Sequence, residues 1–279
     1  MNDAINVGLL GAGTVGGGVL IILEKNAEDI EKKVGVPVRI TKILDNNTAL
    51  ASQLGGKYVV TNKLEDILDD PDIDIVVELI GREHPAKEFI AEALKHKKNV
   101  VTANKDVLAK YGKELFELAE ENNVDFMFEA AVGGGIPIIR PLKSCLAANK
   151  IKSIMGIVNG TTNYMLTKMA EEGADFDEVL KDAQEKGYAE KDPTADIEGH
   201  DPCRKIAILT SLVCGRQVDF EDIHCEGITK ITADDFKYAK VLNRSIKLLA
   251  SSRKVGNSYS CMVAPFMLSA EHPLCGVNG

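Results

Sequence analysis

Ala-Ile-Asn-Val-Gly-Leu-Leu-Gly-Ala-Gly-Thr-Val-Gly, residues 4–16, is a short apolar run followed by glycines with the spacing Gly-x-Gly-x-x-Gly. The apolar run over residues 4–10 predicts a buried strand of a parallel sheet. Val19, Leu20 and Leu23 continue at helical spacing, so a helix is expected directly after the glycines. The motif therefore stands between a strand and a helix, the context in which it binds a dinucleotide. The alternative is a glycine-rich tight turn that binds no ligand.

Each glycine of the motif has an expected role of its own. Gly11 allows the tight turn, Gly13 lets a pyrophosphate approach the backbone, and Gly16 lets the helix and the strand pack closely. The helix N-terminus then faces the phosphates, because its N–H groups and dipole favour negative charge. The residues expected to bind the cofactor here are Gly11, Ala12, Gly13, Thr14, Val15 and Gly16.

Asp45 follows the second expected strand, over residues 36–44, and lies 29 residues after Gly16. This separation is somewhat longer than usual for the acidic residue that binds the adenosine ribose. A carboxylate at this position accepts a hydrogen bond from the ribose 2′-hydroxyl and repels a 2′-phosphate. Asn46 and Asn47 come next, not an arginine, and the sequence therefore favours NAD over NADP. The same residues suit a turn, and both interpretations are compatible.

The alternation of strand and helix continues to about residue 130. Apolar runs predict strands over residues 57–60, 73–79, 99–102 and 125–128, and helices over residues 64–68, 85–95 and 106–121. Ligands of open α/β sheets bind at the carboxyl ends of the strands, and Lys105 follows the strand that ends at Thr102. Lys105 is therefore a candidate for the cofactor and substrate cleft. The alternative is a solvated lysine, although the helix dipole disfavours a cation at a helix start.

Glu129 opens a glycine-rich loop, Glu-Ala-Ala-Val-Gly-Gly-Gly-Ile-Pro, over residues 129–137. Three successive glycines permit unusual backbone angles. Such a loop can direct carbonyl oxygens at one point, which is how a hard cation is held beside a carboxylate. A hinge between domains would use the same glycines, and the sequence favours neither interpretation. We expect the domain boundary near this loop, with residues 1–135 forming a dinucleotide-binding domain.

Residues 136–279 are expected to form an α+β domain in which helices back a sheet. Strands are predicted over residues 151–158, 245–251 and 258–263, and helices over residues 177–186 and 234–239. The segment over residues 159–163, Asn-Gly-Thr-Thr-Asn, suits the start of a further helix because Asn and Thr are favoured N-caps. The predicted fold class is α/β: a Rossmann-type doubly wound parallel sheet followed by an α+β domain.

Residues 183–209 contain four polar groups with chemical potential: Glu190, Asp196, Asp201 and Lys205. Apolar residues at helical spacing predict a helix over residues 202–213, with Asp201 as its N-cap. Lys205 then lies near Asp201 on the same face, at i+4. A loop would thus deliver carboxylates to the start of a helix that carries a lysine. The structural alternative is a cap worth about 1 kcal/mol and an exposed ion pair worth about 0.3–0.5 kcal/mol.

The composition restricts the class of protein. The chain has 279 residues, of which 45% are hydrophobic and 27% charged, as expected for a globular protein of about two domains. The formal net charge of −9 argues against nucleic acid and anionic membranes as partners. The sequence has no apolar run of about 18 residues and no secretory signal at its start. Six cysteines without a Cys-x-x-Cys pair indicate free thiols in a reducing cytoplasm.

Several motifs occur together in one order: the glycine motif, residues 102–105 (Thr-Ala-Asn-Lys), residues 132–137, residues 159–164 and residues 183–205. With this combination, the chain resembles the homoserine dehydrogenases along nearly its whole length. The last two motifs are highly specific, whereas many dehydrogenases share the first. The resemblance implies a reversible, NAD(P)-dependent interconversion of aspartate 4-semialdehyde and homoserine, a small-molecule reaction in the biosynthesis of threonine, methionine and isoleucine.

The resemblance also implies roles for individual residues. Lys205 is the acid/base residue by this match. The residues that bind the substrate are Glu190, Asp201, Asp196 and Lys105, and Lys105 and Gly187 lie beside the cofactor. The match to the family's monovalent-cation site, usually occupied by sodium, comprises Glu129, Val132, Gly134 and Ile136. Members are usually homodimers through the sheet of the second domain, so residues 136–279 are expected to be a substrate and dimerisation domain.

Two features depart from the family pattern. Arg82 follows Gly81 where members commonly have a second glycine near the cofactor, so we expect this cation to alter the nucleotide fit or attract a phosphate. Members also continue beyond residue 279, so we expect a chain truncated at its C-terminus, without a regulatory domain. Two other functions remain open: a Rossmann oxidoreductase for another amino-acid semialdehyde, and an inactive truncated form that only binds nucleotide.

Overall fold

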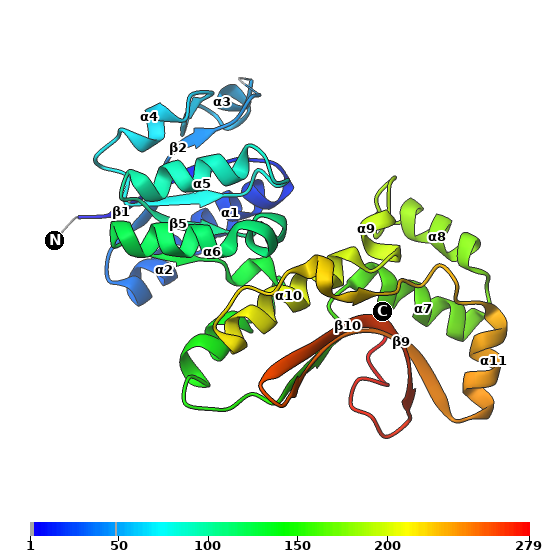
Figure 1. Cartoon of the computed structure of the whole chain (residues 1–279). Helices are drawn as coiled ribbons and strands as arrows, with labels where there is room; N and C mark the ends of the chain where they lie inside the picture. Colours follow the sequence, from blue (N-terminus) through cyan, green and yellow to red (C-terminus); the bar gives the residue numbers. More distant parts are fainter. Residues whose placement is uncertain (1–2, 48) are drawn as a thin grey trace. The chain divides into compact units, whose positions relative to one another are not determined.

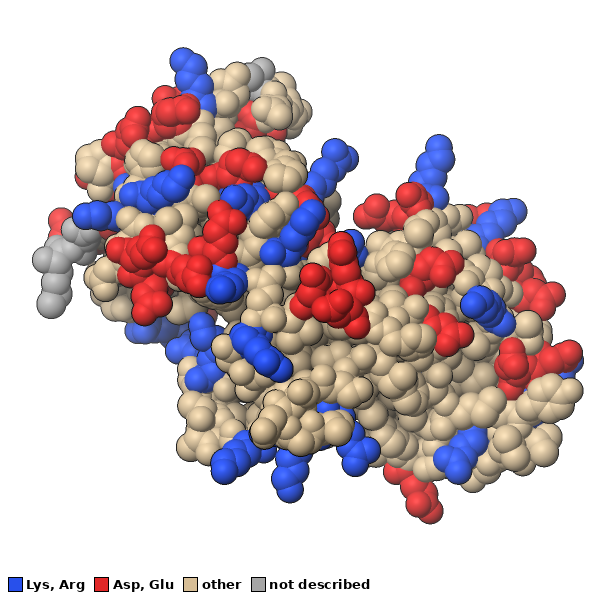
Figure 2. Space-filling view, in the orientation of Figure 1, with Lys and Arg blue, Asp and Glu red and all other residues tan. Residues whose placement is uncertain are grey.

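The structure, a computed structural model, describes residues 3–47 and 49–279 (Figure 1). The chain divides into two compact units, Met1–Pro137 and Ile138–Gly279, each with a sheet of its own. Acidic and basic side chains are interspersed over the face that Figure 2 shows. Across the described residues, no helix combines the length and the apolar character needed to cross a membrane.

The first unit contains a six-stranded parallel sheet. Its strands are β1 (Ile5–Leu10), β2 (Val38–Leu44), β3 (Val59–Thr61), β4 (Ile75–Glu78), β5 (Asn99–Thr102) and β6 (Phe126–Met127). They are arranged in the order β3-β2-β1-β4-β5-β6, and each neighbouring pair is parallel. The strand order reverses between β1 and β4, which places a topological switch point beside the glycine motif. The predicted Rossmann-type doubly wound sheet is confirmed.

Helices connect these strands. They are α1 (Thr14–Lys25), α2 (Ala27–Val34), α3 (Leu50–Gln53), α4 (Glu65–Leu68), α5 (Ala86–Lys95) and α6 (Lys105–Asn122), and the short η1 (Glu129–Ala131) follows β6. Figure 1 shows α5 and α6 side by side along the sheet. Leu20 of α1 packs with Leu9 and Ile43, so the first helix and the first two strands share one buried cluster. This packing fixes the turn that carries the glycine motif.

The second unit is built on a four-stranded sheet in the order β7-β9-β10-β8. Its strands are β7 (Ser153–Gly156), β8 (His224–Cys225), β9 (Arg244–Val255) and β10 (Ser258–Ser269). Strands β7, β9 and β10 pair antiparallel, and β8 runs parallel to β10. The long β9–β10 hairpin turns at Gly256, which has a φ of +60°.

Helices cover the apolar face of this sheet. They are α7 (Gly160–Glu172), α8 (Phe176–Glu185), α9 (Thr194–Ile197), α10 (His200–Cys214) and α11 (Ala233–Val241), with the shorter η2 (Pro141–Cys145) and η3 (Phe220–Asp222). Met165 and Leu166 of α7, Ile206 of α10 and Leu248 of β9 belong to one buried cluster. Both α7 and α10 are therefore held rigidly against the sheet, and the residues at their first turns lie on a packed framework.

The structure corrects the predicted start of α10. The helix begins at His200, and its N-cap is Gly199, whose φ is +83°. The prediction that Asp201 is the N-cap is therefore wrong. Glycine adopts this left-handed cap without steric cost, which leaves Asp201 in the first turn, where the helix dipole favours a carboxylate. The predicted strands over residues 245–251 and 258–263 are also too short, because backbone pairing continues to Val255 in β9 and to Ser269 in β10.

Candidate active site

The glycine motif forms the turn between β1 and α1. Gly11 has a φ of +90°, and its N–H donates to the Leu44 carbonyl at 2.9 Å. A Cβ added at Gly16 would lie 2.1 Å from the Gly11 carbonyl oxygen, so only glycine allows this approach of helix to strand. A Cβ at Gly13 would meet nothing within 4 Å. The loop therefore leaves room for a ligand at the N-terminus of α1.

Asp45 follows β2 and contacts the glycine loop. Its Oδ2 accepts a hydrogen bond from the Ala12 N–H at 3.1 Å, and its Oδ1 accepts one from the Asn47 N–H at 2.8 Å. The carboxylate thus both forms the expected turn and lies beside the loop expected to bind the cofactor. Thr14 and Val15 are exposed at the start of α1, and Val15 retains 58% of its accessible surface.

A buried carboxylate organises the carboxyl ends of β4 and β5. Glu78 has no exposed surface. Its Oε1 accepts hydrogen bonds from the N–H groups of Ile80 at 2.8 Å and Gly81 at 3.3 Å, and its Oε2 accepts one from the Thr102 hydroxyl at 2.6 Å. Glu78 thereby ties the loop after β4 to the end of β5. The sequence prediction missed this role, although an acidic residue inside an apolar run is a signal for it.

Asn104 caps α6 at the same edge of the sheet. Its Oδ1 accepts from the Val107 N–H at 3.1 Å, and its Nδ2 donates to the Arg82 carbonyl at 2.7 Å. Arg82 has a φ of +62°, in the left-handed region that favours glycine. Glycine adopts this conformation without steric cost, which is a physical reason for the glycine that is common at this position in the family. Lys105 is the first residue of α6, which begins directly after β5, so it lies at the carboxyl edge of the sheet as predicted. It is half-buried.

The residues matched to a cation site lie in the last part of the first unit. Glu129 begins η1, and Val132 is buried. Gly133 and Gly134 have φ values of +81° and +51°, so two successive residues adopt left-handed backbone conformations. Ile136 is exposed to 72%. The loop therefore has the backbone freedom that the prediction required.

Lys205 and Asp201 form an ion pair near the first turn of α10. The Nζ of Lys205 lies 2.7 Å from Oδ2 of Asp201 and donates a second hydrogen bond, also at 2.7 Å, to the Val158 carbonyl. Their side chains are exposed to 17% and 7%, respectively. The alternative interpretation, that Asp201 and Lys205 form an exposed ion pair, is therefore wrong. An ammonium has three donors, and these two contacts orient it tightly.

Asp196 joins this pair through an asparagine. The Nδ2 of Asn159 donates to Oδ1 of Asp196 at 2.6 Å and to Oδ2 of Asp201 at 2.9 Å. Asn159 also caps α7, as its residue type predicted, by accepting from the Thr162 N–H. The bridging role of its amide was not apparent from the sequence, because it depends on residues 37 and 42 positions away.

Gly187 and Glu190 lie on the loop between α8 and α9. Gly187 has a φ of +77°, and the Tyr188 and Ala189 N–H groups donate back to the Ala183 carbonyl. The Thr161 hydroxyl of α7 donates to the Tyr188 carbonyl at 2.7 Å, so the loop is tied to the helix that Asn159 caps. The Glu190 side chain is exposed.

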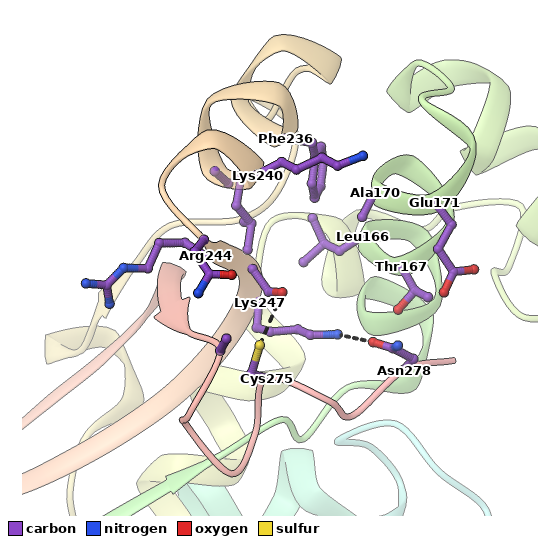
Figure 3. Close-up of a pocket in the computed structure, with 15 residues that line it drawn as sticks. Leu166, Thr167, Ala170, Glu171, Phe236, Lys240, Arg244, Lys247, Cys275 and Asn278 are labelled. Atoms are coloured by element: carbon purple, nitrogen blue, oxygen red, sulfur yellow. Dashed lines mark hydrogen bonds between the residues drawn. The ribbon is translucent and has the colours of Figure 1, made fainter.

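A separate cavity of about 320 Å³ lies between α7, α11 and β9 (Figure 3). Lys247 projects into this region, where its Nζ donates to the Val277 carbonyl at 2.5 Å and to Oδ1 of Asn278 at 2.9 Å. Only 3% of the Lys247 surface is exposed, and this burial lowers the pKa of its ammonium. None of the sequence-predicted site residues lines this cavity, so it is not part of the candidate site.

The predicted residues therefore form groups within each unit. In the first unit, the glycine loop contacts Asp45, and Lys105 stands at the carboxyl edge of the sheet. In the second unit, Asp196, Asp201 and Lys205 converge around one amide. An ammonium oriented by a carboxylate is suited to donating a proton to a developing oxyanion.

Comparisons with known proteins identify the family to which the chain is similar. A family model described as homoserine dehydrogenase, NAD binding domain, matches residues 11–129, and one described as homoserine dehydrogenase matches residues 137–279. The homoserine dehydrogenase of Bacillus subtilis (strain 168) is 45% identical to this chain, and the match covers 99% of this chain and 64% of that protein.

Two solved structures extend the comparison. The crystal structure of a homoserine dehydrogenase from Thiobacillus denitrificans matches with a TM-score of 0.95 and 46% identity over 99% of this chain and 64% of that one. A hyperthermophilic archaeal homoserine dehydrogenase in complex with NADPH matches with a TM-score of 0.82 and 30% identity over 99% of this chain and 85% of that one. The present chain thus spans about 64% of the length of its two bacterial relatives.

Proposed function

This chain belongs to the homoserine dehydrogenase family, and we propose that it catalyses the reversible, NAD(P)-dependent interconversion of aspartate 4-semialdehyde and homoserine. The observation that carries the proposal is the Lys205 ammonium, which is held at 2.7 Å by both the Asp201 carboxylate and the Val158 carbonyl. An ammonium fixed in this way can serve one defined substrate oxygen as a proton donor or, once deprotonated, as an acceptor.

Lys205 acts on the substrate oxygen in this proposal. The nicotinamide, when bound, supplies the hydride that reduces the aldehyde carbon, and negative charge then develops on the aldehyde oxygen. Two N–H donors of Lys205 are used by Asp201 and Val158. The third stabilises the developing charge and delivers the proton that completes the alcohol of homoserine. In the reverse direction, the neutral amine accepts the proton of the hydroxyl.

Carboxylates of the second unit are proposed to bind the substrate. The substrate carries its own ammonium group, and Glu190 or Asp201 can pair with it. Asp196 lies beside Asp201 on the same amide and adds negative charge to this region. Lys105, in the first unit, is the proposed partner of the substrate or the cofactor at the carboxyl edge of the sheet.

We infer that the first unit binds the dinucleotide. The open space at Gly13 and the close packing at Gly16 suit a pyrophosphate at the N-terminus of α1. The hydrogen bond between the Asp45 carboxylate and the Ala12 N–H supports the proposal that Asp45 accepts from a ribose hydroxyl and that NAD is the preferred cofactor. Because one archaeal relative binds NADPH, both cofactors belong in the assay. Gly187 of the second unit is also a proposed cofactor contact.

A monovalent cation, most simply sodium, is proposed at the glycine-rich loop. Glu129, Val132, Gly134 and Ile136 would hold it, with carbonyl oxygens and one carboxylate as ligands. The two successive left-handed glycines support this proposal, because they free the backbone to turn its carbonyls inward. Sodium chloride should then raise the melting temperature more than tetramethylammonium chloride at equal ionic strength. Glu129→Gln should remove that difference, and an equal response of the parent to both salts would exclude the site.

Assembly and compartment are further proposals. Homodimerisation through the sheet of the second unit is supported by apolar side chains that its strands leave exposed, such as Met155 and Met267. Sedimentation velocity of the chain tests this directly, and a monomer at all concentrations would contradict it. The six cysteines are free thiols, which supports a reducing cytoplasmic compartment.

The function is tested by incubating the chain with homoserine and either NAD or NADP and recording absorbance at the wavelength of the reduced cofactor. Homoserine-dependent formation of reduced cofactor is expected. Turnover of a homologous hydroxy amino acid or its aldehyde but not of homoserine would indicate a different semialdehyde oxidoreductase. Cofactor binding without any turnover would indicate a chain that only binds nucleotide.

A further inference from the structure

Asn159 is buried at the start of α7, with only 7% of its surface exposed. Its Oδ1 accepts hydrogen bonds from the backbone N–H and the hydroxyl of Thr162, both at 2.9 Å. Its Nδ2 donates to Asp196 at 2.6 Å and to Asp201 at 2.9 Å. A side-chain amide has two donors and two acceptor positions, so these four contacts use all of them.

These contacts also determine which way the amide points. The reversed orientation would place the NH₂ group against the Thr162 N–H and the oxygen against two carboxylates. Donor would then face donor and acceptor would face acceptor, leaving buried polar atoms unsatisfied. The donor side of Asn159 must therefore face Asp196 and Asp201.

Val158 and Asn159 form hydrogen bonds with both members of the Lys205–Asp201 ion pair. Val158 accepts from the Lys205 ammonium through its carbonyl, and Asn159 donates to the Asp201 carboxylate through its amide. Asp201 uses the same oxygen, Oδ2, to accept from Asn159 and from Lys205. The rotamer of Asp201 is thereby fixed from two directions, and the position of Lys205 depends on it.

We propose that Asn159 is a positioning residue for the acid/base lysine. Its amide holds Asp201 in the rotamer that orients Lys205, and it keeps Asp196 and Asp201 together although both carry negative charge. The proposal rests on the proposed function, because it assigns Asn159 its importance through Lys205. A structural alternative limits Asn159 to capping α7.

Two substitutions separate positioning from capping. Asn, Asp and Ser are about equally effective N-caps, so Asn159→Ser and Asn159→Asp both retain the cap of α7. Both remove the amide donor, and Asn159→Asp adds a third carboxylate. Positioning predicts that kcat falls in the order parent, Asn159→Ser, Asn159→Asp. The lowest value should be about ten- to a hundredfold below the parent, the equivalent of one hydrogen bond to a charged group. The KM for the cofactor should stay unchanged.

Thr232→Ala is the matched control for a lost cap. Thr232 caps α11 of the same unit through a capping box with Asp235 and does not contact the candidate site. This variant should lower the melting temperature and leave kcat unchanged. Asn159 variants that retain the parent's kcat would overturn the positioning role, whatever their melting temperature.

A chemical measurement makes the test independent of turnover. Lys205 is labelled with an amine-acetylating reagent, and its modification rate is followed by peptide mass spectrometry relative to Lys181, whose side chain is exposed to 78%. Asn159→Ser should raise the relative rate at Lys205 several-fold, because the lysine is no longer held. An unchanged rate would overturn the proposal. If the parent shows no homoserine-dependent turnover while the labelling rate still rises, the proposed function fails and the positioning role stands.

Discussion

The Asp45 carboxylate accepts a hydrogen bond from the backbone N–H of Ala12, so the acidic residue after β2 is fixed beside the glycine loop. A fixed negative charge at this point repels a 2′-phosphate. Asp45→Asn removes the charge and keeps the shape. The ratio of the NADPH to the NADH dissociation constant should fall about tenfold, the effect of roughly 1.4 kcal/mol.

Fluorescence titration with each reduced cofactor measures this ratio. Asp29→Asn serves as the control, because Asp29 is an exposed residue of the neighbouring helix α2. Its ratio should equal that of the parent. A parent-like ratio in Asp45→Asn would show that Asp45 is only a turn residue.

Gly16 and Gly18 of α1 give a matched pair of substitutions. Gly16→Ala would place a Cβ 2.1 Å from the Gly11 carbonyl oxygen, so the backbone must move. We expect a loss of about 1–3 kcal/mol in the free energy of unfolding and a weaker cofactor affinity. At Gly18 a Cβ meets nothing within 4 Å. Gly18→Ala should therefore raise the free energy of unfolding by about 0.5–1 kcal/mol, the usual gain of alanine over glycine in a helix.

Urea unfolding with and without cofactor measures both variants. The two substitutions are predicted to change the free energy of unfolding in opposite directions. A general effect of mutating this helix would change it in the same direction for both. Equal destabilisation by the two substitutions would mean that the close approach at Gly16 is not the reason for glycine there.

Arg82 is held with a φ of +62°, which costs a side-chain-bearing residue about 1–2 kcal/mol. Arg82→Gly removes this cost, and the greater freedom of glycine in the unfolded chain offsets part of it. We expect a net gain of about 0.5–1 kcal/mol in the free energy of unfolding. Arg82→Ala removes the same cation but keeps the strained conformation, so it should give no gain. Weaker NADP binding in both variants would indicate that the cation attracts the 2′-phosphate.

Asp182 provides a prediction for pH dependence. Hydrogen bonds from the Tyr164 hydroxyl and the Lys186 ammonium lower the pKa of Asp182 from 3.8 to about 2. A carboxyl group whose pKa is lower in the folded state stabilises the fold above its unfolded pKa. That contribution should be essentially complete above pH 3.8 and be lost as the pH falls through about 2.

Asp182→Asn should therefore be less stable than the parent at neutral pH, and the difference should shrink as the pH falls through about 2. Thermal unfolding across this range measures the difference. Glu185→Gln, an exposed change on the same helix, should show a much smaller difference at neutral pH. A difference between Asp182→Asn and the parent that is independent of pH would contradict the electrostatic explanation.

Local pattern predicted much of the fold. The glycine motif predicted the β1–α1 turn because its spacing reflects backbone conformation and close approach, which are properties of the chain itself. Successive apolar runs predicted the parallel strands, and their ends located Lys105. The start of α10 was mistaken because Asp201 and Gly199 are both acceptable caps, and their choice depends on side-chain partners from other elements.

The long-range contacts of the candidate site were harder to predict from the sequence. Lys205 at i+4 from Asp201 predicted the ion pair, but its burial follows from the packing of α7 and α10 on the sheet. Asn159 was expected only to cap a helix. Its amide reaches Asp196 and Asp201 because the chain returns to this point after 37 and 42 residues, and no local periodicity encodes such a return.

The central claim is that Lys205 transfers the proton of a homoserine dehydrogenase reaction, and the most direct measurement is homoserine-dependent formation of reduced cofactor by the parent and by Lys205→Ala. Lys181→Ala, which changes an exposed lysine, is the control and should match the parent. We predict that Lys205→Ala loses about a hundredfold or more of kcat, the usual contribution of a general acid or base. Activity equal to that of the parent in Lys205→Ala would contradict the assignment.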